Sequence, residues 1–230
     1  MNTLVLLGHS LLAQNGIQCR MPGTILQDML PNVQVWNLAR DGNTAFRTLN
    51  SVDWNGQGTI LDHIKALQPT HLIWSLEVNE TGIGPTKLNV DNRTMTDLVS
   101  DARMLFVNLR ADCPNTKLIY AQSLTGAMLT TDYVTLASQV RNFPWDGWQD
   151  LDYEQCVGAA QDCGDPGLID FAHPTRLTAM FEAAQLASGL GPWFDLPNMM
   201  LPQWNNVAAF RAGLKAGDQW ALSAKKSILS

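Results

Sequence analysis

The sequence predicts an α/β fold, a three-layer α/β/α sandwich with a parallel sheet between two layers of helices. Three observations lead to this prediction: short segments that are apolar throughout, helical patterns that alternate with them, and a composition typical of a compact domain. The 230 residues are 46% hydrophobic and 16% charged, and a chain of this length buries roughly 70% of its unfolded surface. Apolar strands that alternate with helices are typical of parallel sheets covered on both faces.

Five strands are expected because each segment is a short, largely apolar run. They are residues 3–7, 33–38, 71–76, 117–121 and 168–170. Apolar side chains at helical spacing predict the helices between them. The helices are expected at residues 24–30, from 58 to Pro69, at 92–111, at 132–141, and from Pro174 onward. Proline stops the second helix and suits the first turn of the last.

Residues 125–165 fit the alternating pattern poorly, and we expect a long, partly irregular insertion there. Long loops near the carboxyl end of a strand often shape a binding site. The aromatic residues of this insertion could stack on sugar rings, but a small satellite core is the favoured interpretation. They are Tyr133, Phe143, Trp145, Trp148 and Tyr153. We expect two units, a catalytic domain at residues 1–196 and an appendage at residues 197–230.

Charge and apolar patterning exclude several classes of function. The formal net charge is -6, and no run of Lys or Arg could form the basic face of a nucleic-acid-binding protein. No apolar stretch approaches the roughly 20 residues of a membrane span. The N-terminus shows no secretory signal, because residues 3–7 are too few for a signal core. We therefore expect a soluble protein that either is made without export, and is cytoplasmic or part of a virion, or has had its signal removed.

The four cysteines show no CxxC spacing and no paired histidines accompany them, so a zinc site is not expected. Cys156 and Cys163 could form a disulfide in an oxidising compartment, but buried free thiols are the favoured interpretation.

Candidate catalytic residues follow the carboxyl ends of the predicted strands, where the reactive site of such a sheet lies. Ser10 comes after the first strand and Gly8, in a position to present its hydroxyl at the start of a helix. Gly42 follows the second strand and could offer its backbone N–H to an oxyanion. Asn79 follows the third strand, and its neutral amide can donate to an oxyanion without acting as a base. Taken singly, each is better explained as a helix cap or a turn residue.

Few residues could act as the general base, because the chain has only four histidines. His63 lies in the polar stripe of a helix, His71 opens a strand, and the side chain of His9 should diverge from its neighbour Ser10. His173 remains, and Asp170 lies three residues earlier, where it could orient the imidazole by accepting its second N–H. All these candidates fall at one predicted edge of the sheet, which favours a catalytic site over four unrelated turns.

These segments resemble the four sequence blocks of the SGNH hydrolase superfamily, also called GDSL-type esterases and lipases. The blocks correspond to Gly8-His9-Ser10, Gly42, Glu77-Val78-Asn79-Glu80 and the stretch from Asp170 to His173. The approach to the third block, residues 64–76, also resembles the family's helix, proline and strand. The resemblance spans residues 1 to about 190, and its first and last blocks are the more specific.

The resemblance implies a flavodoxin-like five-stranded sheet and a serine esterase that needs no metal or cofactor. Ser10 would be the nucleophile, His173 the base and Asp170 its partner. The oxyanion hole would consist of the backbone N–H groups of Ser10 and Gly42 and the side chain of Asn79.

Two departures from the family pattern stand out. His9 replaces an Asp, and Glu77 and Glu80 replace a Gly and an Asp. Because negative charge beside an oxyanion is unfavourable, we expect Glu77 to point away from the site or to pair with a cation such as Arg40.

A second resemblance concerns residues 205–220, which are similar to an Ala-rich segment near the ends of bacteriophage structural proteins. It implies a virion enzyme with other virion proteins as partners, although an amphipathic terminal helix explains the segment equally well. The expected substrate is an acylated small molecule or polysaccharide, with an O-acetyl group on a carbohydrate favoured. Two alternatives stay open: a non-catalytic glycan-binding module on a decayed hydrolase fold, and a lysophospholipase or thioesterase.

Overall fold

A computed structural model describes residues 1–13, 22–30, 32–51, 56–82, 89–122, 129–168 and 175–194 of the chain. Its centre is a parallel sheet of five strands in the order β2-β1-β3-β4-β5. The strands are β1 (Asn2–Gly8), β2 (Val33–Asn37), β3 (His71–Ser75), β4 (Lys117–Gln122) and β5 (Gly147–Asp150). This flavodoxin-like order confirms the predicted fold class.

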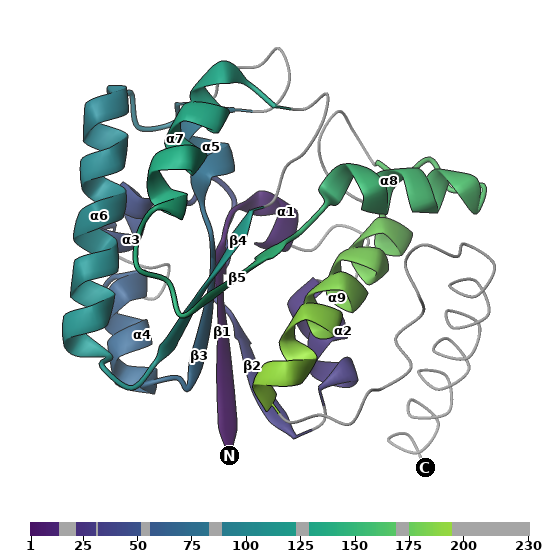
Figure 1. Ribbon diagram of the computed structural model, residues 1–230, viewed down its shortest axis with the longest axis horizontal. Helices are drawn as coiled ribbons and strands as arrows, with labels where there is room; N and C mark the ends of the chain where they lie inside the picture. Colours follow the sequence, from purple (N-terminus) through teal and green to yellow (C-terminus); the bar gives the residue numbers. More distant parts are fainter. Residues whose placement is uncertain are drawn as a thin grey trace.

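Helices cover both faces of the sheet (Figure 1). On one face lie α3 (Ala45–Asn50), α4 (Ile60–Leu67), α6 (Met95–Asp112) and α7 (Thr131–Arg141). On the other lie α2 (Pro22–Met29) and α9 (Arg176–Leu190), with α8 (Tyr153–Asp162) packed on α9. Short helices α1 (Ser10–Ala13) and α5 (Glu77–Thr81) directly follow β1 and β3, and a 3-10 turn, η2 (Gly191–Phe194), follows α9.

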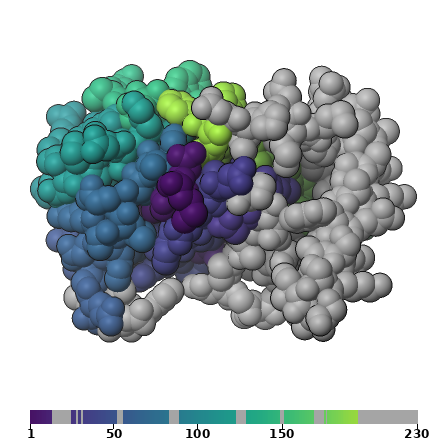
Figure 2. All heavy atoms as spheres, turned by 90° about the horizontal axis from the view of Figure 1, so that it is seen from below, coloured from purple at the N-terminus to yellow at the C-terminus, as the bar shows by residue number. Residues whose placement is uncertain are grey.

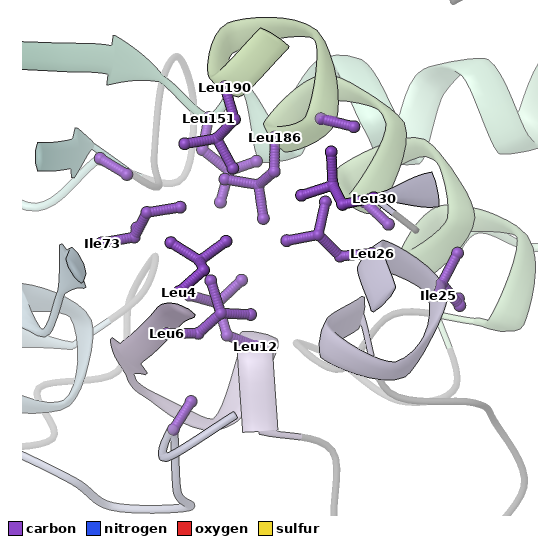
Figure 3. Close-up of a cluster of buried hydrophobic side chains, with 14 of the residues drawn as sticks. Leu4, Leu6, Leu12, Ile25, Leu26, Leu30, Ile73, Leu151, Leu186 and Leu190 are labelled. Carbon is purple, nitrogen blue, oxygen red and sulfur yellow. The ribbon is translucent and has the colours of Figure 1, made fainter. Parts of the chain in front are cut away.

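Strand β1 shows why the sheet is buried on both faces. Its alternate side chains belong to two cores: Leu4 and Leu6 pack under α2 and α9, whereas Val5 and Leu7 pack under α4 and α6. In Figure 3, Leu4 and Leu6 point toward the leucines of α2 and α9. Burying each such side chain stabilises the fold by about 1.5–3 kcal/mol relative to leaving it exposed.

The amino ends of the strands lie at the face opposite the candidate site. Seen from that side, the purple N-terminal residues reach the surface (Figure 2), and Met1 is exposed. Because the strands are parallel, their carboxyl ends all meet at the other edge, where Ser10 and Asn79 follow β1 and β3.

The predicted helices form, and local capping decides where they start. Thr59 and Asp62 form a capping box that begins α4, and Gln68 ends it in the left-handed region at φ 44° before Pro69. The predicted helix at 92–111 begins later, at Met95, because Asn92 has a positive φ of 51° and Thr94 caps the helix. The helical spacing of apolar residues did not predict α3, α5 and α8, because these helices are short or lie in the predicted irregular insertion.

The fifth strand was predicted at the wrong place. Residues 147–150 form β5 beside β4, with Trp148 opposite Tyr120. Leu168 makes an isolated bridge, and the rest of the predicted strand at 168–170 lies outside the described residues. The prediction fails because β5 is an edge strand with an exposed Trp148, and such a strand need not be apolar on both faces.

The aromatic residues of the insertion mostly form a core, as favoured. Tyr133 and Tyr153 are fully buried in one cluster, and Trp145 stacks on Tyr120 with ring centroids 5.4 Å apart. Phe143 packs against the same core. Trp148 is the exception, being exposed beside the Arg141 guanidinium, which lies 4.1 Å from its ring centroid.

Cys156 and Cys163 are not joined by a disulfide in the structure, so that open alternative is not realised. No described helix is long and apolar enough to cross a membrane. The predicted appendage, residues 197–230, lies outside the described part of the chain.

Candidate active site

Ser10 lies at the first residue of α1, immediately beyond the end of β1. The chain turns there at Gly8, where a Cβ atom would lie 2.7 Å from Leu12 Cδ1 and 3.0 Å from the Ser75 carbonyl oxygen. Only glycine fits such a close approach without a shift of its neighbours. The turn leaves Ser10 partly exposed while the residues that follow it in α1 are buried.

His9, the residue beside Ser10, is completely buried and holds this turn. Its Nδ1 atom accepts a hydrogen bond from Leu11 N at 3.3 Å, so the neutral ring carries its proton on Nε2. Nε2 lies 3.3 Å from Ser75 Oγ and can donate to it. Burial lowers the pKa of His9 from 6.5 to about 3. His9 is therefore a neutral structural residue and is not available as a general base.

The pKa of His9 predicts how stability responds to acid. As pH falls below 6.5, the unfolded chain binds a proton at His9 that the folded chain rejects until about pH 3. In that window His9 should reduce the free energy of unfolding by about 1.4 kcal/mol per pH unit. Urea unfolding of the wild type and of His9→Asn across this range measures the effect. A difference between the two proteins that does not change with pH would contradict the assignment.

Gly42 lies in the segment after β2, which runs back to the end of β1. Arg40 N donates to the Gly8 carbonyl at 3.1 Å, and Asn43 Nδ2 donates to the same oxygen at 3.3 Å. Gly42 has a φ of +66°, and a Cβ there would lie 2.8 Å from Arg47 Nη1. The segment is thus tied to Gly8, two residues before Ser10.

Asn79 lies in α5, directly after β3, and is buried. Its Nδ2 donates to the Asn43 carbonyl oxygen at 3.0 Å. An asparagine amide has two N–H bonds, so this link uses one of them. Hydrogen bonds from Asn79 to Asn43 and from Asn43 to Gly8 therefore bring together the segments that follow β1, β2 and β3.

Glu77, which was expected to point away from the site or to pair with a cation such as Arg40, is turned into the core toward Trp74 of β3. Glu77 is buried and accepts hydrogen bonds from Trp74 Nε1 at 2.8 Å and from Leu76 N at 3.2 Å. Trp74 lies in the core, where its indole N–H needs an acceptor. Burial raises the pKa of Glu77 to about 7, so its carboxyl group is not the fully charged group that the sequence implied.

Glu80 is also buried, and its Oε1 accepts from Ala45 N at 2.7 Å. Burial and the neighbouring Glu77 raise the pKa of Glu80 to about 8. Two protonated or partly protonated carboxyl groups therefore flank Asn79. Sequence reasoning missed the role of Asn43 as the link, although its place in a polar segment after a strand was the available signal.

Asp170 and His173 lie outside the described residues, but the residues on either side of them are described. Leu168 packs against the cluster that contains Leu11 and Val78, the neighbours of Ser10 and Asn79. Thr175 caps α9, and its N–H donates to the Gly167 carbonyl at 3.0 Å. The two ends of the undescribed stretch are therefore close together, and one of them lies in the same cluster as Leu11.

The part of the chain that the structure describes contains no group of three or more His, Cys, Asp or Glu side chains that could hold a metal ion. Ser10 follows β1, and Asn79, Glu77 and Glu80 follow β3, at the carboxyl edge of the sheet. Burial raises the pKa of both glutamates.

Comparison of the sequence finds no matching family model and no matching curated protein. Comparison of the structure finds esterases. A family two carbohydrate esterase from Clostridium thermocellum, in complex with cellohexaose, aligns with a TM-score of 0.57 and 13% identity over 85% of this chain and 65% of that chain. The chain thus spans just under two thirds of that esterase.

Two further structures cover 85% of this chain. A carbohydrate esterase family 3 protein from Talaromyces cellulolyticus has a TM-score of 0.57, 14% identity and 99% of its own chain covered. An esterase from Pseudoalteromonas sp., inhibited by monoethylphosphonate, has a TM-score of 0.56, 16% identity and 100% covered. None of these three is a phage protein. At such low identity the likeness concerns the fold, and the chain has the fold of carbohydrate esterases and GDSL-like lipases.

Proposed function

We propose that this chain is a serine esterase that hydrolyses small acyl esters, with O-acetyl groups on a carbohydrate as the favoured substrate. The observation that carries the proposal is the chain of hydrogen bonds from Asn79 through Asn43 to Gly8. It brings Asn79 and the segment of Gly42 to the turn that bears Ser10. A hydroxyl with oxyanion donors beside it is the arrangement that acyl transfer needs.

His173 is proposed as the general base and Asp170 as the residue that orients it. The position of Leu168 supports this assignment, because it packs against the cluster that contains Leu11, the residue after Ser10. The bond from Thr175 N to the Gly167 carbonyl supports it too, because it holds together the described residues on either side of Asp170 and His173 in the sequence. A serine hydroxyl needs such a neighbouring imidazole to take its proton.

The reaction would proceed in two steps. Ser10 Oγ attacks the ester carbonyl carbon while His173 takes the hydroxyl proton, and the carbonyl oxygen becomes an oxyanion. The backbone N–H groups of Ser10 and Gly42 and the second N–H of Asn79 bind that oxyanion. When the intermediate collapses, the alcohol leaves with the proton from His173. Water then attacks the acyl-serine with His173 again as base, which releases the acid and restores Ser10. No metal or cofactor takes part.

The carbohydrate part of the proposal rests on the structural neighbours. Of the three structures reported above, two are carbohydrate esterases, and one of these has cellohexaose bound. The residues that depart from the family pattern also support an intact site. His9, Glu77 and Glu80 each make a specific buried hydrogen bond. The fold therefore accommodates these three departures from the family pattern.

Labelling with a fluorophosphonate probe tests the nucleophile. The probe should modify the wild type once, at Ser10, as located by mass spectrometry of the digested protein. Ser10→Ala should not react. Ser138→Ala, which changes a serine on α7 whose hydroxyl donates to the Thr135 carbonyl, should react like the wild type. Labelling that persists in Ser10→Ala would exclude Ser10 as the nucleophile.

Acetate release from a panel of acetylated polysaccharides tests the substrate. Release of acetate, together with faster hydrolysis of p-nitrophenyl acetate than of long-chain esters, would support the proposal. A preference for long acyl chains would instead indicate a lysophospholipase or thioesterase. Saturable glycan binding without acetate release would indicate a non-catalytic binding module.

A further inference from the structure

Consecutive residues of α5 hold the segment that follows Gly42. Asn79 Nδ2 donates to the Asn43 carbonyl at 3.0 Å, and Glu80 Oε1 accepts from Ala45 N at 2.7 Å. Ala45 is the first residue of α3 and is fully buried, as Glu80 is almost completely. Helix α5 therefore donates one hydrogen bond to residues 43–45 and accepts another from them. We call this pair of bonds the clamp.

We propose that Glu80 is a positioning residue of the esterase site, which holds the Gly42 segment in register with Asn79 through the N–H of Ala45. This inference rests on the proposed function. The donors proposed for the oxyanion hole come from different segments of the chain, so their separation depends on a tie between α5 and the start of α3. Oxyanion donors are effective only when they are held at fixed positions before the reaction.

Other contacts hold the same segment from its outer side. Thr44 Oγ1 donates to Asp91 Oδ2 at 2.6 Å, and Asp91 Oδ1 accepts from Arg47 Nε at 2.6 Å. Within α3, Thr48 Oγ1 donates to Asn43 Oδ1 at 3.2 Å. These contacts orient the start of α3, but they do not connect it to α5. The bonds from Ala45 to Glu80 and from Asn79 to Asn43 make that connection.

The charged groups around Glu80 favour its protonated form. Glu77 lies on the same helix, Asp101 faces it from α6, and Asp91 faces it from the segment before α6. Arg93 neutralises Asp101 through bonds of 3.0 Å, and Arg47 pairs with Asp91. Burial and Glu77 together raise the pKa of Glu80 to about 8. A protonated Glu80 still accepts from Ala45 through its carbonyl oxygen.

Ionisation of Glu80 would place a negative charge one residue from Asn79. That charge opposes the oxyanion that Asn79 is proposed to bind. We therefore expect kcat to fall as Glu80 ionises, when the pH rises above about 8. We also expect that the fall depends on this carboxyl group.

Two substitutions at Glu80 separate its roles. Glu80→Gln keeps a carbonyl acceptor for Ala45 and cannot ionise, whereas Glu80→Met has similar length and no acceptor oxygen. For p-nitrophenyl acetate at pH 7, Glu80→Met should lower kcat about tenfold or more with KM nearly unchanged, and Glu80→Gln should restore kcat to near the wild-type value. At alkaline pH, kcat of Glu80→Gln should not fall. Asp101 is a neighbouring carboxyl that does not contact residues 43–45, so kcat of Asp101→Asn should still fall.

Amide hydrogen exchange at Ala45 tests the clamp without any measurement of activity. In NMR spectra of the full chain, exchange at Ala45 should be at least tenfold faster in Glu80→Met than in the wild type or Glu80→Gln. The Thr48 amide, which bonds to the Thr44 carbonyl within α3, serves as the internal reference and should change little.

The outcomes distinguish this inference from the proposed function. An active wild type together with unchanged kcat in Glu80→Met, or unchanged exchange at Ala45, would overturn the positioning role alone. A wild type that neither hydrolyses esters nor labels at Ser10 would overturn the proposed function, and the catalytic part of this inference with it.

Discussion

Ser10→Ala and His173→Ala are each expected to lower kcat for p-nitrophenyl acetate by about 10⁴-fold or more, with little change in KM. In the proposed mechanism the hydroxyl and the imidazole act as one unit, because an unactivated serine is a poor nucleophile and the imidazole only takes the proton of that serine. The double variant should therefore be hardly slower than either single variant. Steady-state kinetics of the three proteins, with thermal unfolding to confirm that each is folded, measure this.

Matched controls come from the same residue types elsewhere in the chain. Ser138→Ala on α7 and His63→Ala on α4 should retain wild-type kcat, since the exposed Ser138 bonds within its own helix and His63 lies in the helix that precedes β3. In the wild type, kcat/KM should rise with pH as His173 loses its proton near its usual pKa of about 6.5. Full activity in Ser10→Ala, or a rate that does not change between about pH 5 and 8, would refute the assignment.

Asn79→Ala is expected to lower kcat by about 10²- to 10³-fold, the usual loss when one oxyanion donor is removed. KM should change little, because the oxyanion forms during the reaction and is absent from the bound substrate. The substitution also removes the bond to the Asn43 carbonyl, which should cost about 1–3 kcal/mol of stability because a buried acceptor is left without its donor. Kinetics below the unfolding transition and urea unfolding separate the two effects.

The control for Asn79 is Asn50→Ala. Asn50 is exposed at the end of α3, where its amide donates to the Phe46 carbonyl. This variant should change neither kcat nor stability by much. If kcat of Asn79→Ala lies within a few-fold of the wild-type value, Asn79 is not a donor of the oxyanion hole.

The strands next to the site could be predicted because their signal is local. Residues 3–7, 33–38, 71–76 and 117–121 are short apolar runs, and each becomes a strand of the sheet with bounds shifted by a residue or so. The rule that sites lie beyond the carboxyl ends of parallel strands then directs attention to Ser10, Gly42 and Asn79. The structure describes all three at that edge.

The edge strand and the short helices could not be predicted in the same way. Strand β5 is recognised by its pairing with β4, which is a property of two distant segments. Helix α5 has five residues, too few for a periodic pattern, and its stability comes from the buried Glu77 and Glu80 bonds to β3 and α3.

The sequence by itself determined the α/β class, the main strands and the polar residues that follow them, because apolar runs and helical spacing depend on neighbours along the chain. Only the tertiary structure decided what those polar residues contact. It buried His9 as a neutral ring, turned Glu77 and Glu80 into the core, and joined Asn79 to Asn43. The physical reason is that burial, hydrogen-bond partners and pKa values are set by groups that the fold brings together from distant parts of the chain.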